Sequence, residues 1–132
     1  MEQDIRWKQR FQNFEKAFLA LKEVTEIAAP TEIEIDAAVQ RYEIAFELAW
    51  KPLQDYLEEQ GYTDFKGPKR VLVKAFQDGL LDNGELWMTM HEARNVLSHT
   101  YDYDKSRLIF KDIAGRYAGA FESLYKRLNH ER

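Results

Sequence analysis

The chain has 132 residues, a formal net charge of −4 and no cysteine, and 45% of its residues are hydrophobic. These values are typical of a single globular domain over residues 1–132, and they exclude a disordered chain, a disulfide framework and a cysteine zinc site. The negative net charge argues against a protein that coats nucleic acid nonspecifically, because such a protein needs a broadly basic surface. No run is apolar enough to predict a membrane span, and the N-terminus lacks a signal pattern, so we expect a cytoplasmic protein.

Two long helices are predicted in the first half of the chain. Apolar residues at helical spacing begin near Phe11, and Pro30 ends this first helix. Thr31 and Glu34 have the spacing of a capping box, which predicts the start of the second helix. The apolar stripe of that helix runs from Val39 to Tyr56, and Gly61 is a typical helix stop.

Prolines and glycines mark the next elements. Pro52 lies inside the second helix and predicts a kink, because proline removes one backbone hydrogen bond. Residues 61–67 are predicted to form a loop. Pro68 suits the first turn of a short helix that extends to about Gln77, and Gly79 closes it.

Two further helices complete the predicted fold. After a turn at "LLDNG", a fourth helix covers residues 85–98 and a fifth covers residues 105–128, capped by Asp102 or Asp104. No stretch alternates as a strand would. The prediction is therefore an all-α fold, an antiparallel four-helix up-and-down bundle with one short accessory helix.

The fourth helix has two distinct predicted faces. Its core-facing stripe is formed by Leu86, Met90, Ala93 and Leu97. The opposite face carries five polar residues, His91, Arg94, Asn95, Ser98 and His99. Tyr101 follows where the helix should end. An ordinary polar helix end would also explain Arg94 and His99, because cations are favourable near a helix C-terminus.

The stretch "RNVLSHTYD", residues 94–102, resembles the Arg-x4-His-x-Tyr motif of the HEPN superfamily (higher eukaryotes and prokaryotes nucleotide-binding domains). Within that superfamily, "RYEIAFELAWKPLQDYLEEQG" and "DNGELWMTMHEARNVLSHTYD" are similar to signatures of the nucleotidyltransferase substrate-binding proteins. The resemblance covers essentially the whole chain, and Pro52 departs from it. It implies a homodimeric HEPN-like bundle, encoded beside a minimal nucleotidyltransferase. Related pairs act as toxin–antitoxin systems.

The resemblance also implies roles for individual residues. Arg94 and His99 would be the catalytic residues of a metal-independent ribonuclease that needs no cofactor, and Tyr101 would accept AMP from the nucleotidyltransferase, which silences the toxin. Residues of the RNA- or nucleotide-binding groove would be Asn95, Ser98, His91, Glu43 and Glu47. The competing hypothesis is a non-catalytic subunit that presents a nucleotide or another substrate to the same partner.

The predicted chemistry suits these residue types. Metal-independent RNA cleavage needs a base, an acid and a cation beside the phosphate. Histidine can fill either proton role near neutral pH, and the planar fork of arginine fits phosphate oxygens. One chain supplies a single pair of Arg94 and His99. A twofold dimer would bring two pairs to one cleft, which favours a homodimer.

Other residues keep two interpretations. Glu43 and Glu47 either form surface pairs, as Glu47 could with Lys51, or line the groove. His91, Glu92 and His99 lack a recognised metal-ligand spacing, and His91 either lines the groove or is simply solvated. A basic cluster could steer RNA phosphates or simply solvate the short helix; its members are Lys66, Lys69, Arg70 and Lys74. Two glycines in the fifth helix predict a close helix contact; they are Gly115 and Gly119.

Overall fold

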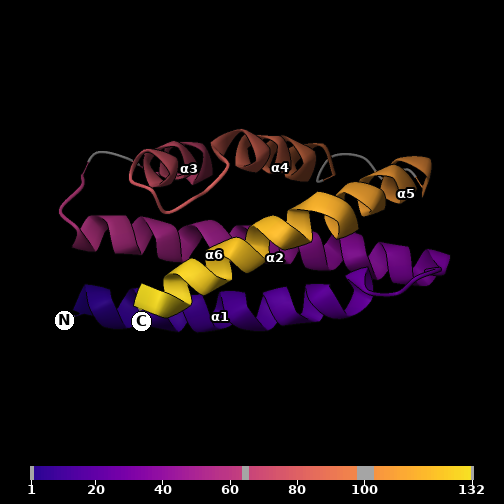
Figure 1. The fold of residues 1–132 in the computed structure, drawn as a ribbon, viewed down its shortest axis with the longest axis horizontal. Helices are drawn as coiled ribbons and strands as arrows, with labels where there is room; N and C mark the ends of the chain where they lie inside the picture. Colours follow the sequence, from indigo (N-terminus) through magenta and orange to yellow (C-terminus); the bar gives the residue numbers. More distant parts are fainter. Residues whose placement is uncertain (1, 64–65, 98–102, 132) are drawn as a thin grey trace.

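The computed structural model describes residues 2–63, 66–97 and 103–131, and every regular element in these ranges is helical. The helices are α1 (Glu2–Thr25), α2 (Glu32–Glu59), α3 (Pro68–Gln77), α4 (Gly84–Leu97), α5 (Tyr103–Asp112) and α6 (Ala118–Glu131). A π-helical turn, η1 (Ile113–Tyr117), joins α5 to α6, and Figure 1 shows the three as one rod that crosses α1 and α2. With α3 as the accessory helix, the predicted antiparallel bundle is confirmed.

The predicted start and end of α2 are confirmed by its hydrogen bonds. The Glu34 backbone N–H donates to Thr31 Oγ1 at 3.2 Å, and the Thr31 N–H donates to Glu34 Oε1 at 2.8 Å. This is the reciprocal capping box that the sequence predicts. At the other end Gly61 has φ 97°, a conformation that glycine adopts without strain. Pro68 begins α3, also as predicted.

The predicted end of the first helix is wrong by several residues. α1 ends at Thr25 rather than at Pro30. The Thr25 hydroxyl donates to the Lys22 carbonyl at 3.0 Å, so a side chain occupies an acceptor near the helix end. The residue before a proline is also biased away from the α conformation, so the helix has to end upstream of it. Pro52 is buried, and α2 continues through it.

Aromatic side chains dominate the core. The largest fully buried ones come from α1, α2, η1 and α6: Trp7, Phe11, Phe14, Tyr42, Phe46, Tyr117 and Phe121. Trp87, which is 2% exposed, attaches α4 to this core. Its ring lies 5.6 Å from that of Phe121 in an edge-on arrangement and 6.2 Å from that of Phe46. Such pairs add about 0.5–1.5 kcal/mol each beyond simple burial.

An ion pair joins α1 to α2, with its carboxylate buried and its guanidinium partly exposed. Asp55 is 2% exposed, and Arg10 Nη1 contacts its two carboxylate oxygens at 3.2 and 3.1 Å. Burial raises the pKa of Asp55, although the nearby charges of Arg10 and Arg6 act in the opposite direction. The charged carboxylate therefore depends on Arg10 for compensation.

The last helical rod differs from the prediction in two ways. The sequence predicts an uninterrupted helix over residues 105–128, whereas η1 inserts a wider turn at Ile113–Tyr117. Asp104 lies inside the first turn of α5, so it is not the cap, and Asp102 lies outside the described residues. None of the helices in the described ranges is long and apolar enough to cross a membrane.

Candidate functional site

The side of α4 that faces the core includes the predicted stripe but is shifted toward Trp87. Met90 is buried, and Leu86, Ala93 and Leu97 are partly buried and packed against the core, as predicted, whereas the buried Trp87 lies outside the predicted stripe. Arg94 follows Trp87 by seven residues, which places it within about 20° of the same direction. Arg94 therefore extends the inner face of α4 toward α2, and the expectation that it lies opposite the core is wrong.

An ion pair between α4 and α2 holds Arg94 in this position. Arg94 Nη2 donates to Glu47 Oε2 at 2.9 Å, and both side chains are about one third exposed (30% and 33%). Arg94 Nη1 also lies 3.5 Å from the side-chain oxygen of Asn95, which is exposed. A charge-assisted contact of this length is stronger than a neutral hydrogen bond.

Glu47 has two further partners on its own helix. Trp50 Nε1 donates to Glu47 Oε2 at 3.2 Å, and Lys51 Nζ lies 3.5 Å from Glu47 Oε1. The predicted pairing of Glu47 with Lys51 is thus confirmed, but the stronger contact is with Arg94. The carboxylate is fixed by three donors, so it offers Arg94 a rigid acceptor.

Glu43 lies one turn before Glu47 and is partly buried. Burial raises the pKa of Glu43, and the charge of Arg94 partly offsets this effect. Arg94 therefore acts electrostatically on both carboxylates of α2. The sequence places Glu43 and Glu47 on one face, but it does not reveal that one arginine from α4 serves both.

His91 lies one turn before Arg94 and is partly buried against α2. Its ring lies 5.8 Å from that of Phe46. Burial lowers the pKa of His91, and the positive charges of Arg94 and Lys69 lower it further. These effects favour the neutral imidazole of His91, which can accept or donate a hydrogen bond.

Tyr42 fixes the position of α4 along α2, a role that the sequence does not indicate. Its buried hydroxyl donates to the Met90 carbonyl at 2.6 Å. Burial raises the pKa of Tyr42 far above its usual range, so the phenol remains a donor. Met90 precedes Arg94 by four residues, and this bond therefore supports the helical turn that carries Arg94.

The structure thus brings together four predicted site residues, Arg94, Glu47, Glu43 and His91, with Asn95 at their exposed edge. The remaining predicted residues, Ser98, His99 and Tyr101, lie outside the described residues. In the described ranges, no three His, Asp or Glu side chains are grouped closely enough to hold a metal ion.

The predicted basic cluster, of which Lys66 precedes α3 and the other members lie on it, is largely exposed, and one member has an aromatic partner. Lys74 Nζ lies 4.0 Å above the centre of the Tyr62 ring. Lys69 is near enough to α4 to lower the pKa of His91. The cluster therefore borders the site, but these contacts favour neither of its two interpretations over the other.

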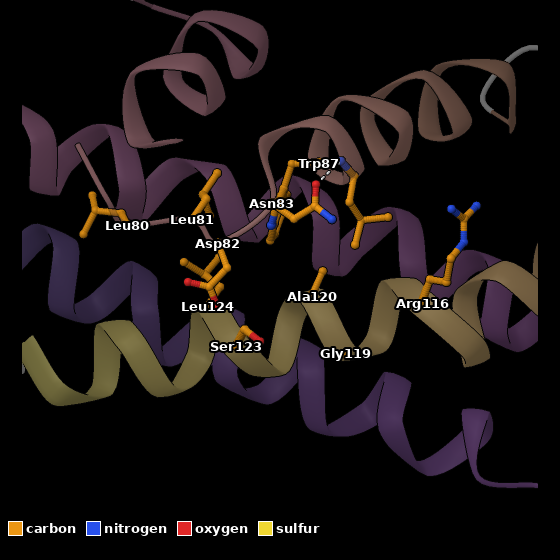
Figure 2. Close-up of a pocket in the computed structure, with 11 residues that line it drawn as sticks. Leu80, Leu81, Asp82, Asn83, Trp87, Arg116, Gly119, Ala120, Ser123 and Leu124 are labelled. Carbon is orange, nitrogen blue, oxygen red and sulfur yellow. Dashed lines mark hydrogen bonds between the residues drawn. The ribbon is translucent and has the colours of Figure 1, made fainter. Parts of the chain in front are cut away.

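A separate pocket of about 210 Å³ lies between the α3–α4 turn and the last helical rod, and Figure 2 shows its lining. Gly119 lines this pocket beside Ala120 and Arg116. The close helix contact predicted from Gly115 and Gly119 is wrong within the described chain, because a Cβ atom at either position would meet nothing within 4 Å. Neither glycine is therefore in close contact with another helix of the described ranges.

The chain matches the family model described as "Nucleotidyltransferase substrate binding protein like" over residues 9–130. The chain belongs to this family. The resemblance to nucleotidyltransferase substrate-binding proteins, noted from the stretches at residues 41–61 and 82–102, is thereby confirmed. As its description states, the family is linked to nucleotidyltransferases.

Named relatives agree with this assignment. A Haemophilus influenzae protein named "Probable ribonuclease HepT" is 31% identical over 83 residues, which is 60% of this chain and 57% of that protein. This chain therefore matches little more than half the length of that relative. A crystal structure from Thermus thermophilus has 38% identity and a TM-score of 0.80, covering 87% of this chain and 98% of its own.

A second solved structure supports the fold alone. It is HI0074 from Haemophilus influenzae, whose title describes the fold of a substrate binding domain of a nucleotidyltransferase. It is 24% identical, with a TM-score of 0.72, and the match covers 90% of this chain and 98% of that one. The helical bundle is therefore a shared framework, and the function has to be argued from the side chains on it.

Proposed function

We propose that this protein is a metal-independent endoribonuclease whose cleavage site contains Arg94 and His99, and that it acts as the toxin of a pair with a minimal nucleotidyltransferase. The observation that carries the proposal is the motif from Arg94 to Tyr101 in a member of this family. The name of the Haemophilus influenzae relative, a probable ribonuclease, adds support. Two copies of the chain would form one cleft around a twofold axis.

The proposed reaction is an internal transfer at phosphorus. A base removes the proton of the ribose 2′-hydroxyl, the 2′-oxygen bonds to phosphorus, and the bond from phosphorus to the 5′-oxygen breaks. An acid then protonates that leaving oxygen, which gives a 2′,3′-cyclic phosphate and a 5′-hydroxyl. The two His99 imidazoles of the dimer would serve as base and acid. Arg94 would stabilise the charge that grows on the phosphate oxygens.

Glu47 would be a positioning residue in this reaction. Its 2.9 Å contact with Arg94 fixes the guanidinium relative to α2, and Trp50 and Lys51 fix the carboxylate in turn. A preset cation does not need to reorganise as the transition state forms. Asn95 and His91 flank Arg94 and would contact the RNA through neutral hydrogen bonds.

Purified protein should cleave single-stranded RNA in the presence of EDTA. Arg94→Ala should lower the rate about a hundredfold or more, since it removes a donor to the transition state. His99→Ala should lower the rate by a comparable factor, since it removes proton transfer. Arg116→Ala and His130→Ala are matched controls at exposed positions and should cleave like the parent. If both motif variants also cleave like the parent, the ribonuclease proposal fails and a non-catalytic substrate-binding subunit becomes the better account.

We further propose that AMP transfer to Tyr101 silences the nuclease. The phenolic oxygen would attack the α-phosphorus of ATP, lose its proton and displace pyrophosphate. The added phosphodiester charge would compete for Arg94, and the nucleotide would block the cleft. The test incubates the protein with the nucleotidyltransferase encoded beside it, ATP and magnesium, and then locates AMP by mass spectrometry. Labelling should disappear in Tyr101→Phe and persist in Tyr103→Phe; labelling that survives in Tyr101→Phe would refute the switch.

A further inference from the structure

A groove at one end of the bundle has the composition of a nucleotide site. It lies between the α1–α2 connection and α5, which Figure 1 places beside each other, and its volume is about 510 Å³. Seven residues line it: Ala28, Ala29, Pro30, Ile35, Arg107, Phe110 and Lys111. None of these belongs to the site around Arg94 described above.

The groove combines an apolar floor with a cationic rim. Ile35 is buried, and Phe110 is partly buried against the core, so the floor is held by the bundle itself. Arg107 and Lys111 are exposed and one helical turn apart, which places their side chains on one face of α5. The seven lining residues, all of them described, include two cations and no carboxylate. Arg107 and Lys111 thus supply positive charge to the rim of the groove, in a chain whose net charge is −4.

The charge of the rim selects an anionic occupant, and the floor selects one that also has a flat apolar part. A nucleotide of single-stranded nucleic acid meets both requirements, because its phosphate pairs with cations and its base packs on apolar or aromatic side chains. An acidic protein segment would satisfy the cations but would leave the apolar floor exposed to water. The pairing of cations with an aromatic side chain therefore favours nucleic acid.

The position of α5 in the chain indicates the path that a bound strand would follow from the cleavage site. α5 begins at Tyr103, two residues after the motif of residues 94–101 ends, and Arg107 and Lys111 follow on the same helix. With a rise of about 1.5 Å per residue, Lys111 lies about 12 Å along α5 from its first residue. A strand that leaves the cleavage site along α5 would meet Arg107 first and then Lys111.

From this arrangement we infer that the groove binds a nucleotide of the single-stranded RNA substrate that flanks the cleaved bond. Arg107 and Lys111 contact its phosphates, and Phe110 with Pro30 receives its base. This inference rests on the proposed ribonuclease function, and it assigns that function a second contact region outside the catalytic motif. The groove fixes where the strand lies and takes no part in proton transfer.

Fluorescence anisotropy with a 2′-O-methyl RNA oligonucleotide tests the assignment, because the blocked 2′-oxygen permits binding without cleavage. The variant Arg107→Gln/Lys111→Gln should bind roughly tenfold more weakly than the parent, and the slope of log K against log [salt] should become shallower by about 1.4, because two phosphate contacts are lost. A control with the same charge change, Lys16→Gln/Lys126→Gln, alters exposed lysines outside the groove and should bind within about twofold of the parent.

A second variant separates charge from folding. Arg107→Lys/Lys111→Arg keeps both cations and should retain the RNA affinity of the parent. If this variant binds RNA as weakly as the glutamine variant does, the assignment is overturned. Unchanged RNA affinity in the glutamine variant would also overturn it, including when that variant loses capture of the co-expressed nucleotidyltransferase. AMP that binds as tightly as the oligonucleotide would assign the groove to a free mononucleotide instead.

The same protein preparation distinguishes the two proposals. If the parent cleaves unmodified RNA in EDTA while the groove variant binds the oligonucleotide normally, only the groove assignment fails. If the parent neither binds nor cleaves RNA, the ribonuclease proposal itself fails, and the groove assignment fails with it.

Discussion

The contact between Arg94 and Glu47 allows a quantitative test, because it joins two helices through one ion pair. Its nitrogen–oxygen distance is 2.9 Å and both side chains are about one third exposed. A hydrogen bond to a charged group contributes about 1.5–3 kcal/mol when protected, whereas an exposed pair contributes about 0.2–1 kcal/mol. The partial exposure places this pair between these two ranges, so we expect a coupling free energy of about 1 kcal/mol.

A double-mutant cycle measures this coupling directly. The parent, Glu47→Ala, Arg94→Ala and the double variant are unfolded in urea at one fixed protein concentration, which keeps any effect of association constant. The coupling should fall by about half or more near 1 M salt, where the Debye length is about 3 Å. Asp112 and Arg116, an exposed pair at 3.2 Å, form the control cycle and should give about 0.3–0.5 kcal/mol. A coupling within about 0.3 kcal/mol of zero for Arg94 and Glu47 would refute the claim that Glu47 fixes the guanidinium.

Further predictions concern residues that support the site and the ion pair between Arg10 and the buried Asp55. Tyr42→Phe should lower the free energy of unfolding by about 1–2 kcal/mol in urea titrations, because the donor to the Met90 carbonyl is lost. Arg10→Ala should lower the free energy of unfolding by about 2 kcal/mol or more, because it leaves the buried Asp55 carboxylate without this partner. Asp55→Asn should lower it clearly less, because it removes the charge itself, and equal losses in urea titrations would contradict this expectation. The lowered pKa of His91 means that stability is lost as pH falls below about 6.5, so His91→Gln should flatten the fall in unfolding free energy measured between about pH 7 and 5.

The boundaries set by local chemistry could be predicted from sequence, whereas those set by the tertiary environment could not. The Thr31 capping box, Pro68 at the start of α3 and Gly61 after α2 all depend on residues within one or two turns of each other. The end of α1 at Thr25 coincides with a local bond from the Thr25 hydroxyl to the Lys22 carbonyl, but threonine makes such bonds inside helices as well, so the residue does not mark a helix end in the sequence. The π turn at Ile113–Tyr117 leaves no comparable signal, because the apolar spacing continues across it.

The contacts of Arg94 could not be predicted from the sequence, because they depend on how α4 is rotated about its axis. An apolar stripe gives the mean direction of the core, but the rotation of α4 is set by where Trp87 meets the aromatic residues of α2 and α6. A rotation of this kind turns Arg94 from the solvent side to the inner side, where its acceptor lies 47 residues earlier in the chain. Helical periodicity on α4 carries no information about a carboxylate on α2.

The chemistry of the RNA ends tests the central claim most directly. A short RNA of defined sequence is incubated with the purified protein in EDTA, and the products are identified by liquid chromatography and mass spectrometry. Internal attack by a 2′-hydroxyl predicts 2′,3′-cyclic phosphate and 5′-hydroxyl ends, with both products formed about a hundredfold or more slowly in Arg94→Ala and His99→Ala. Products with 3′-hydroxyl and 5′-phosphate ends, or cyclic phosphate products that form at the parent rate in both variants, would contradict this mechanism.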